Sequence, residues 1–172
     1  MRATLLALLL LVQGAAAQET IALAVEGWRT ETRNDIVYYR CASPICYRCA
    51  SPICAAGSVV SYKQQPHRTA LTLAEFENHH RGLAAQNKGQ GRIRDVRIND
   101  VKERSVEGVR VMQVSREVDW VDSTTTFTIE SRLIGPDRSF SLVSDSPRRE
   151  WTANNFDGFL RQMVNIAGIR GR

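Results

Sequence analysis

Three neighbouring segments with strand character constrain the fold of this chain more than any other feature. They run over Val109–Trp120, Thr125–Leu133 and Arg138–Val143, and apolar and polar side chains largely alternate along each of them. Alternation with a period of two places one set of side chains on one face of a pleated strand. The turn formers Asp122-Ser123 and Gly135-Pro136-Asp137 separate the segments. The pattern predicts an antiparallel meander whose apolar face is covered by helices elsewhere in the chain.

Two amphipathic helices are expected to provide that cover. The first begins at Thr72-Leu73-Ala74-Glu75, a capping box in which the threonine and glutamate side chains each satisfy a free amide, and it closes at Gly89 and Gly91. Its apolar face carries Leu73, Phe76, His80, Leu83 and Ala84, and the second helix, after Trp151, carries Phe156, Phe159, Leu160, Met163, Val164 and Ala167. We expect one shared core made of Phe76, Leu83, Trp120, Phe127, Ile129, Phe140, Phe156, Phe159 and Met163.

Shorter strands are expected before and between these helices. Gly27–Thr32 and Ile36–Tyr39 flank a turn and predict a hairpin, with Trp28 as a core anchor. Ile93–Ile98 and Val101–Val106 are interpreted as two strands around Asn99-Asp100. In the first strand of the meander, the apolar residues occupy odd-numbered positions before Met112 and even-numbered positions from Met112 onward. This switch indicates either a bulge or a strand between two packed faces. The expected fold class is α+β: an antiparallel meander packed against two helices, with an N-terminal disulfide-bearing hairpin.

The first seventeen residues have the pattern of an export signal. Arg2 is followed by the apolar run Leu5–Val12, which is too short to span a bilayer, and Ala15–Ala17 has the small residues of a cleavage site. We expect residues 1–17 to be removed and residues 18–172 to form a single α+β domain that is periplasmic or secreted. No later segment is long and apolar enough to predict a transmembrane helix.

An exact tandem duplication lies within residues 39–54. The octet Tyr39–Cys46 is repeated letter for letter as Tyr47–Cys54, and the two copies contain Cys41, Cys46, Cys49 and Cys54, the four cysteines of the chain. An exported protein meets an oxidising compartment, so these cysteines are predicted to form disulfides. Duplication of a short loop favours Cys41–Cys46 with Cys49–Cys54, and a nested pairing, Cys41–Cys54 around Cys46–Cys49, is the alternative.

The cysteines and histidines of the chain also have to be considered as redox or metal sites. Cys46-Tyr47-Arg48-Cys49 has the spacing of a redox-active C-x-x-C motif, but no βαβ pattern places it at a helix N-terminus. A zinc site normally separates its cysteine pairs more widely. His79-His80 is interpreted as one histidine at the core edge and one in solvent, because adjacent helical residues point about 100° apart. We therefore expect no catalytic residues, no metal and no cofactor.

The charge of the chain is mildly basic. Removing residues 1–17, whose one charged residue is Arg2, lowers the formal net charge from +5 to +4. Arginine carries most of the positive charge and binds phosphate and carboxylate with two parallel hydrogen bonds. The basic residues are scattered among acidic ones, so no nucleic-acid partner is expected. An envelope protein or an anionic ligand is the expected kind of partner.

From about residue 70 to residue 168 the chain resembles the PsbP-like α/β/α sandwich superfamily, which includes small bacterial envelope proteins. The resemblance rests on the helix Thr72–Asn87, on Val106-Glu107-Gly108-Val109 before a long strand, and on Phe140–Ser144 leading to Asn155-Phe156. It implies a non-enzymatic accessory or binding role. A thiol-disulfide or metal-handling protein that uses Cys41–Cys54 is the alternative.

Overall fold

The protein is described by a computed structural model that covers residues 27–41 and 57–168. Its elements, in chain order, are β1 (Trp28–Arg33), β2 (Ile36–Cys41), β3 (Val59–Gln65), α1 (Leu73–Asn87), β4 (Ile93–Val106), β5 (Val109–Trp120), β6 (Thr125–Ile134), β7 (Ser139–Ser146) and α2 (Arg149–Gly168). The predicted α+β class is confirmed. The predictions for residues 1–17 and for residues 42–56 lie outside the described residues.

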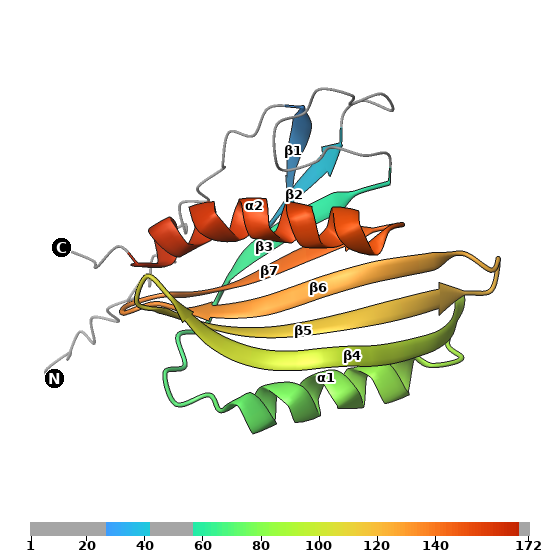
Figure 1. Cartoon of the computed structure of the whole chain (residues 1–172), viewed down its shortest axis with the longest axis horizontal. Coiled ribbons are helices and arrows are strands. Elements are labelled where there is room, and N and C mark those ends of the chain that lie inside the picture. Colours follow the sequence, from blue (N-terminus) through green and yellow to red (C-terminus); the bar gives the residue numbers. More distant parts are fainter. Residues whose placement is uncertain (1–26, 42–56, 169–172) are drawn as a thin grey trace, which may run out of the picture.

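The strands form one antiparallel sheet in the order β1-β2-β3-β7-β6-β5-β4. The meander β5 to β7 is the predicted one, β4 extends it by pairing with β5, and β7 joins it to β1–β3 by pairing with β3. The two helices lie on opposite faces of the sheet (Figure 1). They are also offset, because α2 packs mainly on β7 and β6 whereas α1 packs on β4 and β5. Each face therefore has a part that its helix covers and a part that it leaves open.

The N-terminal hairpin forms as predicted. Asn34 and Asp35, with φ of 51° and 61°, make a two-residue turn between β1 and β2. Positive φ at both central residues gives the backbone twist that suits a hairpin. Trp28, the first residue of β1, is buried, and its ring contacts Phe159 of α2 edge-on with 5.4 Å between the ring centroids. This contact connects the hairpin to the helix that closes the fold.

Strand β5 lies between two packed layers, which explains the change of parity at Met112. Val109 and Val111 belong to the core under α2, whereas Met112 and Val114 belong to a second core under α1. The expectation of one shared core is therefore wrong. Phe140, Phe156, Phe159 and Met163 are in the α2 core, while Phe76 is on the other side of the sheet. A sheet with a helix on each face must divide its apolar residues between the two faces.

The prediction of two strands around Asn99-Asp100 is also wrong. β4 is a single strand along β5, and its register shifts between Ile98 and Asp100. The extra residue at Asn99 is a β-bulge, which adds one residue to one strand without ending the pairing. Because of this bulge, Ile98 and Val101 both pack against the α1 core although they are three residues apart.

Helix α1 has the predicted capping box. The Thr72 hydroxyl accepts a hydrogen bond from the Glu75 amide at 3.2 Å, and the Glu75 carboxylate accepts one from the Thr72 amide at 2.8 Å. Phe76 and His80 are buried, but Leu83 is 37% exposed. Leu83 was expected in the core, and it lines a cavity of about 380 Å³ between α1 and the strands instead. None of the helices in the described part of the chain is long and apolar enough to cross a membrane.

Candidate functional site

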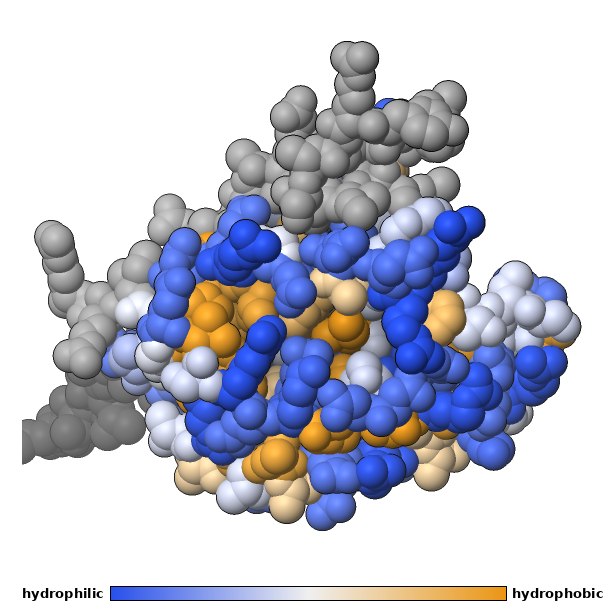
Figure 2. All heavy atoms as spheres, in the orientation of Figure 1, coloured by the Kyte–Doolittle hydropathy of each residue, from blue (hydrophilic) through white to orange (hydrophobic). Residues whose placement is uncertain are grey.

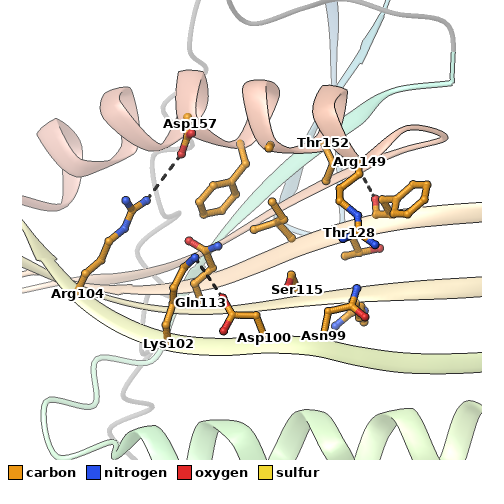
Figure 3. A pocket seen from close by; sticks show the side chains of 15 residues that line it. Asn99, Asp100, Lys102, Arg104, Gln113, Ser115, Thr128, Arg149, Thr152 and Asp157 are labelled. Carbon is orange, nitrogen blue, oxygen red and sulfur yellow. Dashed lines mark hydrogen bonds and ion pairs between the residues drawn. The ribbon is translucent and has the colours of Figure 1, made fainter.

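A cleft lies between the N-terminal half of α2 and the part of the sheet that α2 leaves open. Its volume is about 460 Å³, and its lining comes from β4, β5, β6 and α2. Figure 2 shows hydrophobic side chains in a hollow that hydrophilic side chains surround, and Figure 3 shows the lining from close by. Cavities of this size with a mixed lining are typical of sites for small molecules. We name this cavity the α2 cleft.

Helix α2 is held above the sheet by polar contacts of its first turns. The Thr152 hydroxyl lies 3.1 Å from the Phe127 carbonyl oxygen of β6, and the Ser144 hydroxyl of β7 donates to the Thr152 carbonyl oxygen at 3.0 Å. These contacts fix one wall of the cleft. The opposite wall is β4, which extends past the area that the helix covers.

The bulge in β4 decides which of its side chains face the cleft. After Asn99, Asp100 pairs with Ser115 and Lys102 pairs with Gln113. Paired residues of neighbouring strands point to the same face of a sheet. Asp100, Lys102 and Ser115 therefore lie beside the cleft together with Gln113 (Figure 3). Without the extra residue, the part of β4 that follows it would present its other side chains.

The floor of the α2 cleft combines apolar side chains with one unsatisfied polar atom. Phe127 and Ile129 of β6 and Phe156 of α2 supply the apolar part. Gln113 is only 7% exposed, and its side-chain Oε1 is buried without a hydrogen-bond partner in the part of the chain that the structure describes. A buried acceptor without a donor is uncommon in native proteins and calls for an explanation.

Ion pairs connect the two walls at the mouth of the cleft. Arg104 of β4 lies 3.7 Å from Asp157 of α2 (Figure 3). Arg149 of α2 pairs with Glu117 of β5, and its guanidinium lies over the Phe127 ring at 5.5 Å from the centroid. Most of these charged side chains are exposed, and exposed pairs of this kind are weak enough to open and close readily.

Arg97 adds two further ion pairs beside the mouth of the cleft, with Glu117 and Asp119 of β5. Its guanidinium donates to Glu117 at 2.9 Å and to Asp119 at 2.5 Å. Both hydrogen bonds favour the ionised carboxylates, so the pKa of Glu117 and the pKa of Asp119 lie below their usual values. Both groups are therefore anions at neutral pH. Their arrangement suits fixed ion pairs and does not suit proton transfer near neutral pH.

A second polar cluster lies on the other face of the sheet, beside α1. Arg116 donates to Glu130 at 2.9 Å, and the Nδ1 atom of His80 lies 4.0 Å from the same carboxylate. Burial lowers the pKa of His80, and this effect exceeds the opposing effect of Glu130. The adjacent Asp145 accepts a hydrogen bond from the Thr128 hydroxyl at 2.5 Å, and burial raises the pKa of Asp145.

The histidine prediction is confirmed, since His80 is buried and His79 is exposed. Within residues 27–41 and 57–168, no three or more histidine, cysteine, aspartate or glutamate side chains are grouped so that they would hold a metal ion.

The predicted cysteine site falls mostly outside the described residues. Cys41 is the last residue of β2 and is partly buried against the α2 core. Cys46, Cys49 and Cys54 lie in the segment that the structure does not describe, so the predicted pairing stays a prediction. The α2 cleft was not among the predictions made from the sequence. The only signal for it was Gln113, a large polar residue among the valines of β5.

Comparison with known proteins provides no family for this chain. No protein-family model and no curated protein sequence matches it.

Proposed function

We propose that this chain is a non-enzymatic, exported binding protein and that the α2 cleft holds its ligand. The proposed ligand is a small organic molecule with an apolar body and one N–H or O–H donor. The observation that carries this proposal is the unpartnered Oε1 of Gln113 in the same cleft lining as Phe127, Ile129 and Phe156. Export, periplasmic location and membership of the PsbP-like superfamily are part of the proposal and rest on the sequence features described above.

The energetics of Gln113 favour a ligand that donates a hydrogen bond. Leaving a buried acceptor unsatisfied costs roughly 1–3 kcal/mol. A donor on the ligand would remove that cost when it binds, so the cleft gains most from a molecule with a donor at this position. Phe127, Ile129 and Phe156 contact the apolar remainder. Such a site is specific, because an analogue without the donor leaves the acceptor unpaired.

We also propose that the duplicated cysteines have a structural role next to this domain. β2 and β3 are paired up to Arg40 and Val59, and the Cys41 amide donates to the Ser58 carbonyl oxygen at 3.4 Å. The segment 42–56 therefore connects two strands whose ends already meet. Disulfides within such a connection would restrict a loop without supplying redox chemistry.

The test is an NMR titration with two matched probes. N-butylacetamide has an apolar tail and an N–H donor, and N-butyl-N-methylacetamide lacks the donor. We expect the first probe to bind about threefold to tenfold more tightly, the range that one neutral hydrogen bond supplies. The shifts should concentrate on the side-chain amide of Gln113 and the methyl groups of Ile129.

Gln113→Leu is the informative variant, because leucine removes the unsatisfied acceptor and keeps the position apolar. The variant should fold as the parent does and bind the two probes equally. Gln90→Leu makes the same change at an exposed position and should keep the preference. If Gln113→Leu keeps the preference for N-butylacetamide, the acceptor does not recognise the ligand and the proposal fails.

A further inference from the structure

A smaller pocket lies on the opposite face of the sheet, where α1 leaves β6, β7 and β3 uncovered. Its volume is about 310 Å³. Arg132 of β6 and Ser141 of β7 are paired residues that line it from the sheet, and Arg68 lines it from the connection between β3 and α1. Leu71 and Phe76, both largely buried, form an apolar side. We name this cavity the α1 pocket.

Arg132 has an unusual environment for an arginine. The Nη1 atom of its guanidinium is buried without a hydrogen-bond partner, and Arg132 forms no salt bridge with any residue that the structure describes. Burial lowers the pKa of Arg132, the positive charge of Arg68 lowers it further, and the negative charge of Glu130 opposes both effects only in part. Two guanidinium groups that repel each other across one pocket destabilise the empty state, and an anion between them would relieve that repulsion.

The two carboxylates that line the α1 pocket, Glu130 and Glu75, accept their hydrogen bonds from groups other than Arg132 and Arg68. Glu130 accepts the hydrogen bond from Arg116 and lies beside His80. Glu75 accepts hydrogen bonds from the Thr72 amide at 2.8 Å and the Thr72 hydroxyl at 2.9 Å as part of the helix cap. Neither glutamate is within salt-bridge distance of Arg132, so no carboxylate of the described residues pairs directly with its guanidinium.

The neighbouring groups indicate which kind of anion would fit the α1 pocket. The Ser141 hydroxyl accepts a hydrogen bond from the Gln65 side chain at 2.9 Å, which fixes both groups beside Arg132. A guanidinium offers two parallel N–H donors that match the two oxygens of a carboxylate. Leu71 and Phe76 line the same cavity, so the group attached to the carboxylate meets an apolar surface.

We propose that the α1 pocket binds a small organic carboxylate with a short apolar tail, and that Arg132 and Arg68 hold its carboxylate. This site is separate from the α2 cleft and does not depend on the function proposed for that cleft. Its ligand class differs too, because the α2 cleft offers an acceptor and the α1 pocket offers cationic donors.

The experiment measures binding of hexanoate by NMR titration at pH 7 and constant ionic strength, with acetate, inorganic phosphate and neutral hexanamide as comparison probes. Hexanoate should bind at least about tenfold more tightly than acetate, because its four additional methylene groups reach apolar surface. Hexanamide should bind much more weakly, because it has no charge for the two arginines.

Arg132→Gln and Arg68→Gln should each weaken hexanoate binding about tenfold or more, the range for a hydrogen bond to a charged group. Arg29→Gln removes the same charge from the exposed face of β1 and should change the affinity less than twofold. Arg132→Gln should not lower the melting temperature of the free protein, since it removes an unpaired, partly buried cation. Arg68 is exposed, so Arg68→Gln tests the pocket without altering the core.

Three results would overturn the inference. Unchanged hexanoate affinity in both Arg132→Gln and Arg68→Gln would remove the site. Tighter binding of phosphate than of hexanoate would remove the carboxylate assignment. Loss of hexanoate binding in Gln113→Leu would place the anion in the α2 cleft. If instead the two acetamide probes fail to bind the α2 cleft, the proposal for the α1 pocket still stands.

Discussion

Replacing Gly135 with alanine tests how closely the end of α2 lies on the turn between β6 and β7. A Cβ atom at Gly135 would lie 1.9 Å from the carbonyl oxygen of Ala167 and 2.7 Å from its carbonyl carbon. Both atoms belong to the backbone, so no side-chain rotation removes the overlap. The turn and the helix end would have to separate by more than an ångström to reach 3.0 Å, the shortest distance that real Cβ atoms normally show.

The cost of that separation follows from what the helix end buries. Ala167 is fully buried, and Met163 and Val164 on the preceding turn are buried in the same core. Overpacking of a well-packed region typically costs about 1–3 kcal/mol, and we expect the upper part of that range because backbone must move. For a domain of this size the melting temperature should fall by about 4–12 °C.

The measurement is urea unfolding followed by the fluorescence of Trp28, Trp120 and Trp151. Gly168→Ala is the matched control, because its Cβ would lie 3.6 Å from a methyl group of Val109, an ordinary contact distance. The control should remain within about 0.5 kcal/mol of the parent, as most surface changes do. Equal free energies of unfolding for Gly135→Ala and the parent would refute the close approach of helix and turn.

Three further predictions address the core, the buried carboxylate and the duplication. Phe159→Ala should cost about 3–5 kcal/mol of unfolding free energy, because the ring is fully buried against Trp28 and Tyr39; a loss below about 1 kcal/mol would contradict the docking of α2. Asp145→Asn should raise the melting temperature at pH 7.5 and leave it unchanged near pH 4, because a carboxyl whose pKa is raised by burial destabilises the fold only while it is ionised. A lower melting temperature of the variant at both pH values would contradict this prediction. Deleting residues 47–54 should barely change the melting temperature under oxidising conditions if each octet closes its own disulfide, and free thiols in the deletion would favour the nested pairing.

The elements of the fold were largely predictable because they depend on local chemistry. The capping box at Thr72 and Glu75 marks the start of α1 through contacts within one turn. The turn at Asn34-Asp35 likewise needs only residues that tolerate positive φ. Asn99-Asp100 was wrongly predicted to separate two strands, because the same polar residues suit a turn and a bulge. Only the pairing with β5 decides between those two outcomes.

The cavities beside the helices were not predictable, because they depend on where each helix lies across the sheet. Phe127, Trp120 and Leu83 are apolar residues at regular positions, so they were assigned to the core. The structure places Phe127 in the α2 cleft, and it places Trp120 and Leu83 in the cavity beside α1. The offset of the helices converts residues of core type into cavity walls, and periodicity along one segment contains no information about that offset.

The bulge at Asn99 also affects how the protein meets other molecules of its own kind. β4 is one of the two edge strands of the sheet, and its free edge would otherwise offer fourteen residues of backbone to a neighbouring chain. Edge strands of this length favour uncontrolled polymerisation unless the protein interrupts or charges them. The bulge breaks the regular spacing of that edge, and exposed charged side chains such as Lys102 and Glu103 resist burial in a contact between strands. We therefore expect the protein to remain dispersed at high concentration, and we expect deletion of Asn99 to make it prone to aggregation.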